Sequence, residues 1–386
     1  MRTITNSSNI NYKDQSRAYG WRRWAMGTLA GGLAIAMLAG CSSSTSDNRI
    51  VIEKPDKEIT VVTDNNGPVS ETIEVERIDK LDGVRGMDWL SDSELVISRE
   101  NKERPPIRVE GEQRHPLNLF AYELASGKDR LLVQDEDNKH ANFAVLSPSR
   151  SYMFYKMNIE ESAYAYIMDL KTGEKKQVSE ELVPIRDGVW DGDGTVVFSG
   201  TPGQVYAAHP DRETEKLLSL SGNARFPVLF KGLLYYTDEK STARIYSPKD
   251  GTTTTLAEKV EQIFPSPDGA RLALVTMTGE TERTLVVTDL KGNVQTKLSK
   301  GTQIFGTAWS PDGTKLAYNL IDEGDNGVKG IVVADAATGK TTFATIDVPY
   351  ASDPVAWSPA GNKLVASTFV NDDQGSRMVT YVVTLK

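Results

Sequence analysis

The chain has 386 residues, one cysteine and an acidic balance of 53 Asp and Glu residues against 44 Lys and Arg residues. A single cysteine excludes an internal disulfide, and without the first 40 residues the acidic excess grows to 52 against 39. Nucleic acid is therefore not an expected partner, because nucleic-acid-binding domains usually carry a basic surface.

The first 40 residues have the pattern of an export signal. Arg22 and Arg23 precede an apolar run from Trp24 to Ala39. A positive segment, a short apolar run and a small-residue cleavage site are typical of a signal peptide. The run is also shorter than the roughly 20 residues that cross a bilayer as a helix. We therefore expect residues 1–40 to be a cleaved signal peptide, with an uncleaved membrane anchor as the alternative.

Residues 38–41 read Leu-Ala-Gly-Cys, which resembles a bacterial lipobox. The resemblance implies that Cys41 carries a diacylglyceryl group and becomes the mature N-terminus. Two or more acyl chains hold a protein stably at a membrane surface. We therefore expect an extracytoplasmic protein that is lipid-anchored to a bacterial membrane, whether the envelope has one membrane or two. Residues 41–70 are rich in Ser, Asp, Asn and Lys and are expected to form a flexible tether, in which 59–63 have the composition of a short strand.

From about residue 71 onward the chain is a series of strands and tight turns. Residues 71–78 alternate polar and apolar with a period of two, which indicates a strand. The later segments 309–318 and 357–366 both read as strand, Pro-containing turn, strand, and 266–274 repeats the turn. The Trp residues that follow the leader fall at one register of this repeat: Trp89, Trp190, Trp309 and Trp357. Self-similarity of this kind is typical of a repeat fold.

A second turn follows at a regular offset in most units, at 125–128, 170–174, 248–251, 290–293 and 337–340. Two hairpins in each unit predict four strands. The first strands of the units open near Gly86, Ala141, Ile185, Arg225, Val260, Ile304 and Asp353. The last unit has only three strands before Lys386, so the strand at 71–78 can supply its fourth and close a ring.

These observations predict an all-β domain over residues 71–386: a seven-bladed β-propeller of four-stranded antiparallel blades, closed by an N-terminal strand. The domain offers about 45 residues to each of seven blades, close to the ~40–45 typical of such repeats. Six blades would need about 53 residues each, which fits such repeats less well. An open solenoid or two β-sandwiches are the other architectures with this strand content. The repeated Trp residues are expected to pack between blades rather than to bind a ligand.

The Trp-Ser-Pro-Asp-Gly-x-x-Leu-Ala corner at 309–317 resembles the WD40-like (PD40) repeat of the TolB-type propellers, and the resemblance covers the chain from roughly Glu71 onward. It implies a propeller fold. Similar propellers serve as binding scaffolds, as side domains of proteases and occasionally as enzymes, so the resemblance implies no single activity. TolB itself has an additional N-terminal α/β domain for which this chain has no room, so Pal binding is not carried over. The corners at 147–151, 191–194 and 230–232 depart from the motif.

Residue types that carry catalysis are few. The three histidines, His115, His140 and His209, fall in different loops or strands, and no Gly-x-Ser-x-Gly elbow is present. We therefore expect no enzyme activity. The alternative is an envelope hydrolase or lyase with its site at the channel mouth, where His115 and His140 would converge with carboxylates.

Three Asp-rich segments, 191–194, 322–327 and 371–374, offer oxygen ligands of the kind that Ca²⁺ prefers. None has the EF-hand spacing, and Asp, Asn and Gly are also the ordinary residues of tight turns. Turn formation is the favoured interpretation, with Asp322, Asp325 and Asn326 as weak calcium candidates. No other metal or cofactor is expected.

The long connections emerge on one face of the predicted ring, and the longest covers 101–117. In an otherwise acidic protein it carries basic residues and stiffening prolines, a composition that favours docking of a partner. The candidate partner-binding residues are Lys102, Arg104, Ile107, Arg108, Arg114 and His115. An intramolecular contact with the acidic segments 135–137 and 372–373 is the alternative.

These features predict a noncatalytic scaffold that binds an envelope protein or a wall component through its long-loop face. A module that binds wall glycan or peptide shares the same features and remains open.

Overall fold

The computed structural model describes residues 49–386 except 55–56, 63–72, 110–111, 135–138, 160, 202, 324–326, 346–353 and 373–374. The predicted signal peptide, Cys41 and much of the predicted tether lie outside the described residues. All regular elements in the described part are β-strands. No helix there is long and apolar enough to cross a membrane.

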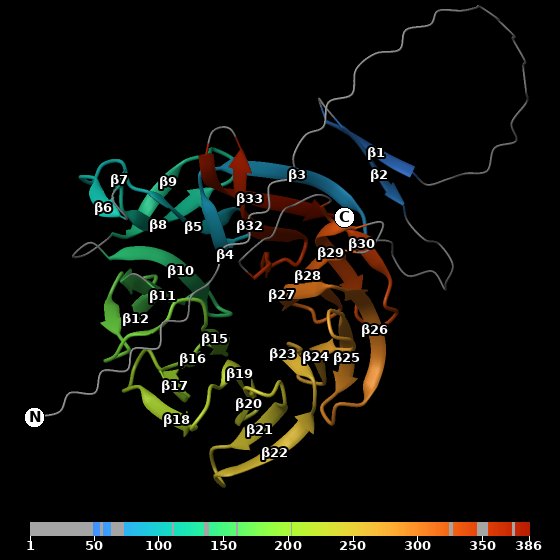
Figure 1. Ribbon diagram of the computed structural model, residues 1–386. Coiled ribbons are helices and arrows are strands. Elements are labelled where there is room, and N and C mark those ends of the chain that lie inside the picture. The colour runs from blue at the N-terminus through green and yellow to red at the C-terminus, as the bar shows by residue number, and fades with distance from the viewer. Residues whose placement is uncertain are drawn as a thin grey trace, which may run out of the picture. The chain divides into compact units, whose positions relative to one another are not determined.

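Seven antiparallel sheets follow one another around a ring (Figure 1). Blade 1 comprises β4 (Arg85–Ser91), β5 (Glu94–Glu100), β8 (Leu117–Glu123) and β9 (Asp129–Val133). Blade 2 comprises β10 (His140–Leu146), β11 (Tyr152–Ile159), β12 (Ser162–Asp169) and β13 (Lys175–Gln177), with β14 (Val183–Pro184) also paired to β12. Blade 3 comprises β15 (Val189–Asp191), β16 (Thr195–Ser199), β17 (Gln204–Ala208) and β18 (Glu215–Ser219).

The second half of the ring repeats this order. Blade 4 comprises β19 (Arg225–Phe230), β20 (Leu233–Thr237), β21 (Ala243–Ser247) and β22 (Thr252–Ala257). Blade 5 comprises β23 (Val260–Pro265), β24 (Arg271–Met277), β25 (Arg283–Asp289) and β26 (Val294–Gly301). Blade 6 comprises β27 (Gln303–Trp309), β28 (Lys315–Ile321), β29 (Lys329–Asp335) and β30 (Thr341–Phe343). Blade 7 comprises β31 (Ala356–Trp357), β32 (Lys363–Asp372), β33 (Gly375–Leu385) and β3 (Val75–Asp82).

Blade 7 closes the ring with strands from both parts of the chain, as the sequence predicts. β3 pairs with β33 from Val75 opposite Leu385 to Asp82 opposite Val379, and Figure 1 shows β3 along the outer side of β33. The strand runs from Val75 to Asp82, later in the chain than the predicted 71–78. Without β3, the edge of β33 would expose unpaired backbone groups, which promote aggregation.

A buried polar network joins blade 7 to blade 1. The Thr380 hydroxyl accepts a hydrogen bond from the Gly86 N–H at 2.7 Å and donates one to the Val84 carbonyl at 2.8 Å. The Ser367 hydroxyl donates to the Gly86 carbonyl at 2.8 Å. The blades approach so closely here that a Cβ on Gly86 would lie 2.7 Å from side-chain carbons of Thr380 and Val365. Residue 86 must therefore be glycine if this spacing is to be kept.

The core lies between neighbouring blades. One cluster, for example, packs Leu285 of blade 5 against Leu316 and Tyr318 of blade 6. The repeated Trp residues take part in these interfaces, and each indole N–H donates to a backbone carbonyl of the preceding blade: Trp89 to Ala356, Trp190 to Val145, Trp309 to Phe264 and Trp357 to Ala308, at 2.9–3.1 Å. The prediction that they pack between blades is confirmed. Their shared register follows from this shared bond.

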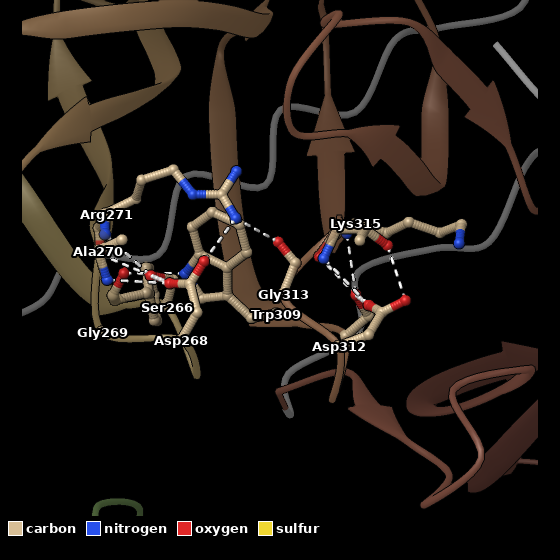
Figure 2. Close-up of polar contacts among 12 residues, drawn as sticks. Ser266, Asp268, Gly269, Ala270, Arg271, Trp309, Asp312, Gly313 and Lys315 are labelled. Atoms are coloured by element: carbon tan, nitrogen blue, oxygen red, sulfur yellow. Dashed lines mark hydrogen bonds and ion pairs between the residues drawn. The ribbon is translucent and has the colours of Figure 1, made fainter.

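The turns between the first and second strands also touch one another around the ring. Figure 2 shows the corner of blade 5, where the Arg271 guanidinium binds Asp268 at 3.0 Å and the Gly313 carbonyl of blade 6 at 2.8 Å. The same guanidinium lies over the Trp309 ring, 5.2 Å from its centroid. Gly313 has a φ of +70°, a conformation that favours glycine. The turn between the first two strands of blade 5 thus also links blade 5 to blade 6.

Two further strands lie in the segment predicted as a tether. β1 (Arg49–Lys54) and β2 (Lys57–Val62) pair antiparallel, with Ile52 opposite Ile59. The strand suggested by the composition of 59–63 falls in β2.

Replacement of Thr380 by valine should destabilise the ring at its closure. The change keeps the shape of the side chain but leaves the buried Gly86 N–H without its acceptor, which costs about 1–3 kcal/mol. Urea unfolding followed by tryptophan fluorescence measures this loss. Thr281→Val, at an exposed position, is the control and should change the free energy of unfolding by less than about 0.5 kcal/mol. Equal stability of the two variants would contradict a closing role for Thr380.

Candidate functional site

The long connection of blade 1 contains a small hairpin of its own. β6 (Ile107–Val109) pairs with β7 (Glu112–Arg114), and Figure 1 shows the hairpin at the outer margin of blade 1 beside β8 and β9. The sequence indicated a loop here, because three-residue strands are too short for a periodic pattern. The hairpin gives the predicted binding segment a defined shape.

Hydrogen bonds fix the root of this hairpin to blade 1. The Asn101 N–H donates to the Pro116 carbonyl at 2.9 Å and joins the two ends of the connection. The buried Asn101 side chain donates to Asn118 at 2.8 Å and accepts from the Glu103 N–H at 3.1 Å. The connection is therefore held on the rigid sheet at its base.

The structure brings His115 and His140 to this root, where both bind backbone groups. The His115 Nδ1–H donates to the Arg104 carbonyl at 2.8 Å. The His140 Nδ1 accepts from the Leu117 N–H at 3.0 Å, so this nitrogen carries no proton. His209 lies apart in blade 3, where its Nδ1 is 2.9 Å from the Gly194 carbonyl. Among the described residues, no group of three or more His, Cys, Asp or Glu side chains could hold a metal.

The predicted contact residues differ in exposure. Lys102 and Arg114 are exposed, as are the stiffening prolines Pro105 and Pro106. Arg104, Ile107 and His115 are half-buried. The side chains of Arg108 and Asp372 and the residues 135–137 and 373 are not described, so the alternative of an intramolecular contact with the segments 135–137 and 372–373 stays a prediction.

Two of the Asp-rich segments lie at least partly in the described part. The Asp322 N–H donates to the Val328 carbonyl at 2.9 Å, while Asp325 and Asn326 lie outside the described residues. Asp193 accepts from the Ser149 N–H of blade 2 at 2.8 Å, and this bond lowers the pKa of the Asp193 carboxyl. Burial raises the pKa of Asp191 in the same turn. Asp193 therefore links two blades.

A buried ion pair between blades 2 and 3 was not predicted from the sequence. Lys156 of β11 is fully buried, and its Nζ donates to Asp187 at 2.6 Å and to the Pro184 carbonyl at 2.5 Å. Burial lowers the pKa of Lys156 from its ordinary value, against the opposing effect of Asp187. Asp187 also accepts from the Ser199 N–H of blade 3 at 2.7 Å. The pair thus ties β11, the connection after β14 and β16 together.

The register of Lys156 explains its role. Blades 1, 3 and 7 have a serine at this position of the second strand, and its hydroxyl donates to a carbonyl at the start of the next blade: Ser98 to Ala141, Ser199 to Ala224 and Ser367 to Gly86. Lys156 makes the same kind of bond to Pro184 with a longer side chain. A lysine inside the apolar run 152–159 was the available signal in the sequence.

A groove of about 580 Å³ lies on the flank of these two blades. We define the interblade groove by Gln177–Val183 of blade 2 and by Gly200, Thr201, Gln204, Tyr206, Glu213, Thr214 and Lys216 of blade 3. Its blade 2 wall is an arch: β13 and β14 both pair with β12, and residues 178–182 connect them. The sequence did not reveal the groove, because its walls come from different blades.

Acidic side chains dominate the groove. Glu180, Glu181 and Glu213 are exposed on its walls, against the single cation Lys216 among the lining residues. Burial raises the pKa of the Tyr206 hydroxyl, and the nearby carboxylates of Glu181 and Glu180 raise it further. The Tyr206 ring packs on Phe198 with a centroid distance of 5.6 Å.

Comparison with known proteins supports the fold alone. No protein-family model and no curated protein matches the sequence. An oligogalacturonate lyase from Vibrio parahaemolyticus is similar, with a TM-score of 0.60 at 12% identity over 87% of this chain and 96% of that chain. A structure of the mitotic checkpoint complex has a TM-score of 0.54 at 13% identity over 88% of this chain and 99% of the matched chain. TolB from Acinetobacter baumannii has a TM-score of 0.45 at 14% identity, over 77% of this chain and 65% of its own.

Lys156→Met should destabilise the protein by about 3 kcal/mol, because it leaves the largely buried Asp187 carboxylate without its cation. The double variant Lys156→Met/Asp187→Asn removes both charges and should recover part of this loss, which denaturant unfolding measures as a coupling energy. Lys171→Met, at an exposed turn, is the control and should stay within about 0.5 kcal/mol of the parent protein. Strict additivity of the Lys156 and Asp187 changes would show that the two groups are not coupled.

Proposed function

We propose that this protein is a lipid-anchored extracytoplasmic lipoprotein of the TolB-type WD40-like propellers, and that it acts as a noncatalytic scaffold. In this proposal the β6–β7 hairpin on the long-loop face binds an envelope protein or a wall component. The proposal rests chiefly on a connection that is fixed at its root and has exposed side chains at Lys102, Pro105, Pro106 and Arg114. A segment with this architecture loses little conformational entropy when it docks.

The chemistry of the hairpin supports recognition. Lys102 and Arg114 are exposed on the 101–117 connection, and the exposed prolines precede β6. Arginine is enriched among the residues that contribute most to protein interfaces. His115 and His140, the side chains best suited to acid–base chemistry, instead bind backbone groups at the root. The nearby histidines therefore support a positioned binding segment rather than a reaction centre.

The expected membrane location follows from the leader sequence and not from the propeller. The lipobox-like residues 38–41 and the short apolar run before them favour acylation of Cys41 after export. The segment 42–70 would then separate the ring from the membrane. No metal or cofactor is part of the proposed function.

Crosslinking in cells tests the role of the hairpin. A photoreactive residue at Ile107 should form a discrete crosslinked species in intact cells. Lys102→Glu/Arg114→Glu should abolish that species, because it reverses the charge of the contact surface. The control Lys171→Glu/Lys291→Glu makes the same charge change at exposed turns on the opposite face of the ring and should leave the crosslink intact. Equal crosslinking in the charge-reversal and control variants would exclude the hairpin as the contact. Replacement of 102–115 by Asn-Gly removes the crosslinking position itself, so it is read by pull-down, where it should abolish capture of the partner.

Substitution of Cys41 tests the lipid anchor. Cys41→Ser should release the protein from the membrane fraction, because serine cannot form the thioether that holds the diacylglyceryl group. Fractionation and metabolic labelling with a fatty acid measure the change. Ser42→Ala is the neighbouring control and should keep both the label and the membrane location. Membrane retention of Cys41→Ser would contradict the lipoprotein assignment.

A further inference from the structure

We propose that the interblade groove between blades 2 and 3 binds an extended peptide segment through its lysine or arginine side chains. The site lies on the flank of the ring and involves none of the hairpin residues. It therefore does not depend on the proposed function of the long-loop face.

The hydrogen bonds inside the groove determine what kind of ligand it can take. Four donor groups of its lining are already bonded within the protein. The Gln177 amide donates to the Ser179 carbonyl at 2.7 Å, and the Thr214 hydroxyl donates to the Val178 carbonyl at 2.9 Å. The Thr201 hydroxyl donates to the Leu182 carbonyl at 3.4 Å, and the Tyr206 hydroxyl donates to Gln204.

The groove therefore offers mainly acceptors to a ligand. The carboxylates of Glu180, Glu181 and Glu213 can accept several bonds each, and they outnumber the single Lys216. A ligand that brings donors and positive charge complements them. An ammonium group has three donors and a guanidinium has five, whereas phosphates and uronates carry negative charge, which the carboxylates of the groove repel.

The size of the groove suits a ligand with several groups better than a bare ion. A volume of about 580 Å³ lies within the range of roughly 300–1,000 Å³ typical of ligand sites. A single water takes about 30 Å³ of the liquid, and an ammonium ion is of similar size. Several groups of one ligand can therefore lie in the groove together, as an extended peptide with spaced basic side chains requires.

The walls of the groove are held in place before any ligand arrives. Lys156 fixes the Pro184 end of the arch through its bonds to the Pro184 carbonyl and to Asp187. At the other end, Lys176 donates to the His209 carbonyl of blade 3 at 3.3 Å. A buried ion pair carries a large desolvation cost, so rigidity at this position is obtained at the expense of stability. Lys156 is thus a positioning residue for the groove.

Fluorescence anisotropy with a defined probe tests the proposal. The probe is a fluorescein-labelled peptide of four Ser-Lys repeats, added to the full chain purified in detergent at about 0.15 M salt, where distant charges are screened. We expect saturable binding that Glu180→Gln/Glu181→Gln weakens about tenfold or more. The control Glu258→Gln/Glu280→Gln removes two exposed carboxylates from connections of blades 4 and 5 and should change the affinity less than about twofold.

Three results would overturn the proposal. Equal weakening by the two Gln pairs would show general attraction to an acidic protein. Equal binding of the peptide after Nε-acetylation would show that the ammonium groups are not recognised. Tighter binding of spermidine than of the peptide would assign the groove to a free polyamine. The Asn-Gly replacement of 102–115 should still bind the peptide, which separates this result from any failure of the hairpin proposal.

Discussion

The pairing of β3 with β33 is the constraint on which the rest of the ring depends. A sheet of three strands at the end of blade 7 would leave the backbone groups of β33 unpaired, and the edge would be open to other chains. β3 covers this edge from Val75 to Asp82. The same blade then meets blade 1 through Thr380, Ser367 and Gly86, where the approach is too close for any side chain at position 86. Blade 7 thus combines the strand pairing that closes the ring with the close contact to blade 1.

Each interface between blades is a variation on a small set of bonds to backbone carbonyls. A Trp indole on the first strand and a serine on the second are the recurring donors. The interface of blades 2 and 3 departs from this pattern, since Lys156 takes the serine position and recruits Asp187. The long side chain of Lys156 reaches the longer connection between β13 and β15, and part of that connection forms one wall of the groove. The substitution of serine by lysine at this interface therefore coincides with the proposed binding groove.

The ring carries two different kinds of surface. The β6–β7 hairpin is an extension from one blade, with its root fixed by Asn101 and with Lys102 and Arg114 exposed. The interblade groove is a concavity shared by two blades and lined by three carboxylates. The first suits contact with a large partner, and the second suits a basic segment. A rigid scaffold supports both, because neither needs the blades to move.

The sequence by itself determined the repeat, and with it the all-β class, the four-stranded blades, the count of seven and the closure by a strand near residue 75. These features depend on local turns and on period-two patterns, which neighbouring residues specify. The packing of the Trp residues between blades was predictable for the same reason, since the four Trp residues share one register of the repeat. The leader pattern and Cys41 are also sequence features, and their role remains a prediction.

Only the tertiary structure decided what lies between blades. Lys156 and Asp187 are 31 residues apart, and no local pattern indicates that they meet. The groove walls likewise come from two blades, so the burial of Tyr206 beside Glu180 and Glu181 depends on how the sheets pack. The histidines at the hairpin root became positioning groups only once their backbone partners were in place. The sequence shows which side chains are present, but their surroundings depend on contacts between residues that are far apart in the chain.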